Sequence, residues 1–164
     1  MASLTPFQTV GPYLHIGLRA GVDAHAPAAA PRVLVRGRLL DGQGAGIPDG
    51  LLEWWHPSLT TVHRSMTGED GVFVFEAVRP PAIDGPDGSV QAPHFAVRVL
   101  ARGILTHYMT RLYFADDPVT ATDPILKLVP EGRRQTLLAE AVSANEYRFD
   151  VVVQGQNETV FFDI

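Results

Sequence analysis

The chain contains no cysteine among its 164 residues, which excludes a disulfide framework and any metal site built on thiolates. No apolar run reaches the roughly 18 residues of a membrane-spanning helix, so we expect no membrane partner. Cations are in the minority: the net charge of −5 argues against nucleic acid, which binds to cationic surfaces. The start of the chain also lacks the basic and apolar stretches of a signal peptide, and we expect a cytoplasmic protein.

The chain does contain a series of short apolar segments separated by glycine and proline. A hydrophobic fraction of 46% and a charged fraction of 19% are ordinary for a globular protein, and 164 residues are enough for one domain with a real core. The first segment ends at the turn signal Asp41-Gly42. We predict strands at 33–41, 50–56, 71–78, 94–103, 106–114, 136–142, 147–155 and 159–164. Such spacing predicts an all-β fold, a β-sandwich or a barrel.

Helix is expected to be scarce, with one or two short segments. The stretch 123–129 favours a turn or two of helix, with Asp123 as N-cap and Pro124 in the first turn. We expect this helix to be a packing element at the edge of the sandwich.

An Ala/Pro run at 24–32 divides the chain into an N-terminal arm with its linker, residues 1–32, and a sandwich domain, residues 33–164. The arm carries several large apolar side chains, which solvated tails seldom do: Phe7, Tyr13, Leu14 and Ile16. It therefore packs on something, either as an edge strand of its own sandwich or against a partner.

The histidines give half of a metal-binding pattern. On a strand, residues two apart point to the same face, so a ligand pair would occupy positions 94 and 96. Position 94 is His94, but position 96 is Ala96. No H-x-H or H-E-x-x-H motif occurs among the six histidines, His15, His25, His56, His63, His94 and His107.

No other catalytic constellation stands out from the residues. The chain has no Gly-x-Ser-x-Gly elbow and no glycine-rich phosphate loop. Two classes of function therefore stay open. One is a metal-free sandwich that binds an aromatic or sugar ligand, and the other is a metal enzyme that uses His63, His94 and His107 in an unfamiliar way.

Six segments, which together run from Thr5 to Ile164, resemble the intradiol ring-cleaving dioxygenases: "TPFQTVGPYLHIGL", "LLEWWHP", "APHFAVRVLARGI", "TRLYFADD", "RRQTL" and "YRFDVVVQGQNETVFFDI". The resemblance implies a β-sandwich of the intradiol type, in agreement with the predicted strands. It also implies a complex of two homologous chains, in which a beta chain holds a ferric ion with two tyrosines and two histidines. This chain is similar to the alpha chain, which has lost those ligands.

The positions that match the iron ligands support that reading. The paired histidines fall on His94 and Ala96, and the loop before them contains no tyrosine. His63 stands near the place of the other tyrosine. By resemblance the metal site is vestigial, so we expect no metal and no catalytic residue in this chain, and Fe(3+) only on the partner beta chain.

The resemblance implies that this chain instead lines the substrate pocket of the beta chain. The residues that match this role are Thr9, Gly11, Pro12, Tyr13 and Arg102. Glycine lets backbone approach a flat ring closely, and arginine offers a cationic fork for a carboxylate. The implied reaction of the complex is cleavage of the small aromatic acid protocatechuate by dioxygen to 3-carboxy-cis,cis-muconate.

Overall fold

The structure is a computed structural model that describes residues 31–58, 62–85 and 87–163. The described part of the chain is mostly strand, as predicted. The strands are β1 (Arg32–Leu40), β2 (Leu51–Trp55), β3 (His63–Met66), β4 (Val72–Val78), β5 (Ile83–Asp84), β6 (Val90–Gln91), β7 (His94–Leu100), β8 (Tyr108–Phe114), β9 (Leu138–Ser143), β10 (Glu146–Arg148) and β11 (Val151–Val152).

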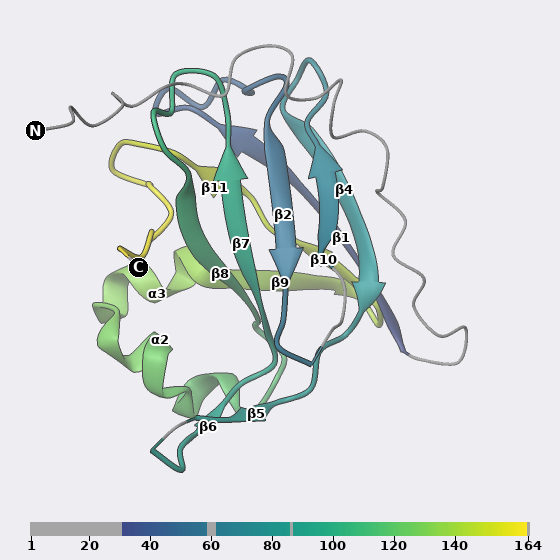
Figure 1. Ribbon diagram of the computed structural model, residues 1–164, viewed down its shortest axis with the longest axis vertical. Coiled ribbons are helices and arrows are strands. Elements are labelled where there is room, and N and C mark those ends of the chain that lie inside the picture. Colours follow the sequence, from purple (N-terminus) through teal and green to yellow (C-terminus); the bar gives the residue numbers. More distant parts are fainter. Residues whose placement is uncertain (1–30, 59–61, 86, 164) are drawn as a thin grey trace, which may run out of the picture.

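The helices are short and lie together between β8 and β9 (Figure 1). They are the 3-10 turns η1 (Thr120–Thr122) and η2 (Gln135–Leu137) and the α-helices α2 (Pro124–Leu128) and α3 (Glu131–Arg134). Asp123 caps α2 and Pro124 opens it, so the predicted helix is confirmed. In the described part of the chain, no helix is both long and apolar enough to cross a membrane.

Two layers of strands face each other across the core. In hydrogen-bonding order, β11, β1, β10 and β9 lead into β8, β7, β2 and β3, and β4 pairs with the other edge of β1. β9 joins the layers, because it pairs antiparallel with β10 and parallel with β8. The expected β-sandwich is confirmed, and its layers are seen in Figure 1.

Trp54 is the centre of the core. Its ring is fully buried and stacks on Phe75 of the opposite layer at 4.6 Å between centroids. Its indole Nε1 donates to Ser65 Oγ at 2.8 Å, which leaves no polar atom of the ring without a partner. Stacking and edge contacts with Phe73, Phe95 and Phe149 complete an aromatic cluster that holds the layers together.

Two segments differ from the sequence prediction. The segment 147–155 is split into β10 and β11, which pair with two separate parts of β1. Between those parts Gly37 lies so close to Phe149 that a Cβ at position 37 would sit 1.7 Å from the Phe149 carbonyl oxygen. The strand predicted at 159–164 is wrong for the described residues 159–163, which form no strand. Isolated bonds hold this end instead: Thr159 N donates to Val152 O, and Phe162 N donates to Met109 O.

The sequence prediction also missed strand β3 and the hairpin of β5 and β6. β3 is four residues of mixed polarity that pair with β2, so it has little pattern of its own. The predicted arm and most of its linker lie outside the described residues, and the boundary near residue 32 stays a prediction.

Candidate functional site

The opening of β7 carries the half-motif found in the sequence. His94 lies opposite Tyr113 of β8, and Ala96 lies opposite Arg111. These four side chains share the outer face of the sheet, since Phe95 and Val97 between them point into the core. Position 96 therefore faces the same way as His94, but brings no metal-binding atom.

His56 is the side chain that meets His94. The two rings pack edge to face at 5.3 Å between centroids, and both are buried. The backbone N–H of Ser58 donates to His56 Nδ1 at 3.2 Å, so this nitrogen is the acceptor and Nε2 carries the hydrogen. That buried Nε2 has no hydrogen-bond partner among the described residues. His94 Nδ1, in contrast, lies 2.7 Å from Ala92 O and donates to it.

A buried polar chain runs from the histidines to helix α2. Tyr113 packs against His94, and its hydroxyl donates to Asp123 Oδ1 at 3.1 Å. Arg111 Nη1 donates to the same hydroxyl at 3.1 Å and to Gln91 Oε1 at 2.9 Å. Asp123 also accepts from Leu126 N and Ala92 N, so its buried charge is well satisfied.

Burial and the charge of Arg111 keep this cluster in its uncharged forms. Burial is the larger cause and Arg111 the second, and together they lower the pKa of His56 and that of His94 to about 4. Burial likewise raises the pKa of the Tyr113 phenol above its usual range. At neutral pH the site therefore holds two neutral imidazoles and a neutral phenol.

The chemistry of these donors does not fit a ferric ion. A tyrosinate ligand must lose its proton, but the Tyr113 hydroxyl is used as a donor to Asp123 and its pKa is raised. Ala96 supplies no imidazole beside His94 on the same face of the strand. Across residues 31–58, 62–85 and 87–163, no group of three or more histidine or acidic side chains is placed to hold a metal.

The structure does not bring His63 and His107 to His94. His63 lies opposite Trp54 and packs edge to face on Phe75 at 5.5 Å, so it points to the core side of the sheet. Burial, and then Arg32, lower the pKa of His63. His107 is exposed and precedes Tyr108, which pairs with Val99 at the far end of β7. The three histidines proposed for an unfamiliar metal enzyme thus lie in three separate places.

Arg102 lies at the other end of β7 from His94. The seven residues of the strand separate the two by roughly 20 Å. The Arg102 side chain is 52% exposed, and its Nη2 lies 3.5 Å from Asp49 Oδ2. Thr9, Gly11, Pro12 and Tyr13 lie outside the described residues, so their predicted place beside Arg102 stays a prediction.

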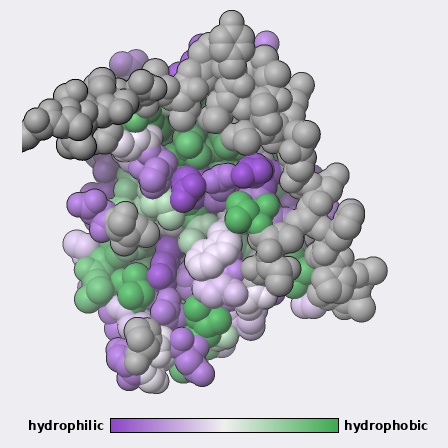
Figure 2. Space-filling model, in the orientation of Figure 1, coloured by the Kyte–Doolittle hydropathy of each residue, from purple (hydrophilic) through white to green (hydrophobic). Residues whose placement is uncertain are grey.

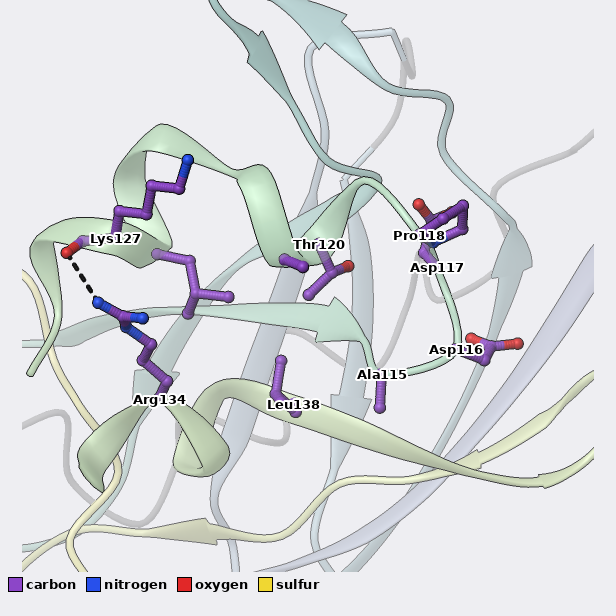
Figure 3. A pocket seen from close by; sticks show the side chains of 10 residues that line it. Ala115, Asp116, Asp117, Pro118, Thr120, Lys127, Arg134 and Leu138 are labelled. Atoms are coloured by element: carbon purple, nitrogen blue, oxygen red, sulfur yellow. Dashed lines mark hydrogen bonds between the residues drawn. The ribbon is translucent and has the colours of Figure 1, made fainter. Parts of the chain in front are cut away.

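A hollow of about 430 Å³ lies on another side of the molecule, between η1, α2 and the start of β9 (Figure 3). Asp116 and Asp117 line one side of it and Lys127 and Arg134 the other. Most of these charged side chains already have partners within the protein: Asp117 pairs with Arg79, and Arg134 donates to the carbonyls of Lys127 and Val129. These contacts stabilise the helical segment, and the lining of the hollow offers no set of groups for chemistry.

Sequence reasoning missed His56, Arg111 and Tyr113 as neighbours of His94. The signal for two of them lies in the alternation of the segment 106–114, which puts Arg111 and Tyr113 on one face. Their meeting with His94 depends on the register between β7 and β8, which the residues alone do not fix. His56 follows the last residue of β2, so its direction is set by the turn.

The low pKa values predict loss of stability in acid. The unfolded chain, with histidine near its usual 6.5, binds more protons than the folded chain between about pH 6.5 and 4, so stability falls as pH falls through that window. We expect His94→Gln to reduce the drop in unfolding free energy between pH 7 and pH 4.5 by about 2 kcal/mol. Urea unfolding at the two pH values measures it.

His107→Gln is the matched control, because His107 is an exposed histidine at the far end of the strand. It should keep the wild-type pH dependence. An unchanged drop in His94→Gln would contradict the prediction.

Comparison with known structures agrees with this fold. The dioxygenase domain of a dioxygenase carbohydrate-binding fusion protein from Streptomyces sp. SirexAA-E superposes with a TM-score of 0.63 at 23% identity, covering 93% of this chain and 99% of that one. Hydroxyquinol 1,2-dioxygenase from Pseudomonas putida gives a TM-score of 0.62 at 18% identity, over 77% of this chain and 57% of that one. These likenesses establish the fold alone.

Sequence comparison is more specific. No family model matches the chain. A protocatechuate 3,4-dioxygenase alpha chain from Burkholderia cepacia is 39% identical over 98% of this chain and 97% of its own length. The alpha chain from Pseudomonas putida is 34% identical over 97% and 96%. The beta chain from Burkholderia cepacia is 26% identical over 93% of this chain and 76% of its own. The chain therefore belongs to the family of protocatechuate 3,4-dioxygenase alpha chains.

Proposed function

We propose that this chain is the alpha subunit of a protocatechuate 3,4-dioxygenase, an oxidoreductase of aromatic-compound catabolism. It binds no iron itself and assembles with a homologous beta chain, on which Fe(3+) supports cleavage of protocatechuate by dioxygen to 3-carboxy-cis,cis-muconate. The observation that carries the proposal is sequence identity of 34–39% with two alpha chains over nearly the full length of this chain. A cytoplasmic location remains a prediction within it.

The geometry of the site supports a subunit that has no catalytic metal of its own. Ala96 and the protonated Tyr113 leave the outer face of β7 without the donors that a ferric ion needs. The similarity to a beta chain as well as to alpha chains supports a complex of two homologous chains. The stand-alone module that the sequence left open is not favoured, since named relatives match along almost the whole chain.

The contribution of this chain is to position the substrate in the partner's pocket. Arg102 projects from the turn after β7, half-exposed and held loosely by Asp49. Asp49 adopts a left-handed backbone conformation, with φ of 57°, two residues before β2. A guanidinium placed in this way can bind the substrate carboxylate and orient the ring for reaction on the partner's metal. Thr9, Gly11, Pro12 and Tyr13 of the arm complete the proposed wall.

The proposed function makes three predictions, of which the first concerns iron. The chain purified without its partner should contain far less than one iron per chain and should cleave no catechol, because position 96 is Ala96 and Tyr113 is held protonated. Metal analysis and the visible absorption of tyrosinate bound to iron measure this, with the assembled complex as positive control. Near one iron per isolated chain would contradict the proposed division of labour.

The second prediction concerns Arg102. In the assembled complex, Arg102→Ala should raise KM for protocatechuate about 10- to 150-fold more than KM for catechol, which has no carboxylate. A charge-assisted contact worth roughly 1.5–3 kcal/mol gives that ratio. Steady-state kinetics on both substrates measure it.

Arg36→Ala is the matched control, since Arg36 of β1 is a comparably exposed arginine that pairs with Glu146 of β10. It should leave both KM values unchanged. An equal rise for both substrates in Arg102→Ala would mean that Arg102 supports the fold or the interface instead.

The third prediction concerns the arm. Removing residues 1–13 should leave a cooperatively melting sandwich, because the described core begins at Val33. The complex should keep the iron of the beta chain but lose at least about 10-fold in activity per iron, since part of the pocket wall is gone. Thermal unfolding, metal analysis and turnover are the measurements.

Removing residues 1–4 is the control, because it spares Thr9 to Tyr13, and it should keep full activity. Unchanged activity after removal of residues 1–13 would end the pocket role of the arm. A truncated chain that cannot fold would show that the arm is an edge strand of this sandwich.

A further inference from the structure

A groove on the outer face of the sheet is not used by the proposed function. It adjoins the histidine cluster and therefore lies at the opposite end of β7 from Arg102. Its main hollow has a volume of about 550 Å³, within the usual range for small-molecule sites. The strands β7 and β8 form one side, and α2, the start of α3 and the chain end near Phe162 form the other (Figure 1).

The floor of the groove is one row of residues across three strands. Trp55 of β2 lies opposite Ala96 of β7, and Ala96 lies opposite Arg111 of β8. Neighbouring strands are about 4.8 Å apart, so the backbones of Trp55 and Arg111 are roughly 10 Å apart. Between them Ala96 contributes only a methyl group, which leaves a gap above the sheet. An indole then stands on one side of the gap and a guanidinium on the other.

The walls around this row are mostly apolar. Ile125 and Val129 line the helix side, and Met109 lies next to the row on β8. Trp55 is 45% exposed although it is large and aromatic. In Figure 2, apolar and near-neutral side chains gather on the face formed by β2, β7 and β8, below a band of polar ones. Such walls suit a flat apolar ring.

Arg111 supplies the charge that selects the ligand. One of its nitrogens, Nη1, is held from behind by two neutral acceptors, Gln91 Oε1 and the Tyr113 hydroxyl. Within the described residues no carboxylate pairs directly with Arg111, unlike Arg98 in the adjoining hollow, which pairs with Glu53. The guanidinium is thus fixed in direction and keeps two donor groups for an anion.

We propose that this groove is a second binding site, for a small aromatic carboxylate, on the alpha chain itself. The carboxylate accepts from Arg111, and the ring lies over Ala96 against Trp55. The site is separate from the pocket lined by Arg102 and has no role in the chemistry of the partner. It would let an aromatic acid bind to the complex away from the iron.

Benzoate is the probe, and the assembled complex is the protein. Calorimetric titration should find one benzoate site per alpha chain in addition to any site at the partner's iron. The visible spectrum of the iron reports benzoate bound at the iron separately. Ala96→Leu should remove the groove site and leave the titration of the iron spectrum unchanged. Because Ala96→Leu keeps every hydrogen bond of Arg111, it tests the site even if Arg111→Gln does not fold.

Arg111→Gln should weaken benzoate at the groove about 10-fold or more, and neutral benzamide should bind the wild type at least about 10-fold more weakly than benzoate. Arg36→Gln, a distant arginine with a carboxylate partner, should bind as the wild type does. Equal benzoate stoichiometry in the wild type and in Ala96→Leu overturns the proposal. The same result is expected if a segment of protein fills the groove, because neither protein could then bind benzoate there. The benzoate titrations do not test the role of Arg102, which is tested by the kinetics of Arg102→Ala.

Discussion

The buried carboxylate of Asp123 is the contact on which the arrangement of the outer face depends. It accepts from the N–H of Leu126 inside α2, from the N–H of Ala92 before β7, and from the hydroxyl of Tyr113 on β8. A fully buried charge is tolerated only when such donors surround it. One side chain thereby fixes the helix to the sheet and holds Tyr113 as a protonated donor, which denies the site a tyrosinate.

The two ends of β7 differ in character. At the His94 end, neutral imidazoles, a phenol and Arg111 form a compact polar cluster beside an apolar groove. At the other end, Arg102 stands half-exposed beside Asp49. One end of the strand is thus a buried polar cluster, and the other end presents a half-exposed cation.

Much of the fold could be predicted from local patterns. Alternating apolar residues marked β1, β4, β7 and β8, and Asp123 with Pro124 marked the start of α2. The prediction was wrong at 159–163, where an apolar run packs on neighbours without a ladder, and it missed β3, which takes its structure from β2. In both places pairing with distant residues decides the conformation, and local propensity does not.

The sequence by itself determined which atoms are absent. Without a histidine at position 96 and without a tyrosine in the loop before β7, two of the ligands that the resemblance implies for iron are missing whatever the fold. The tertiary structure alone decided which side chains meet. His56 rather than His63 lies against His94, because His63 is paired with Trp54 and faces the core. Arg111 reaches the groove through the register of β7 and β8, and a slip of one residue would turn it to the other face.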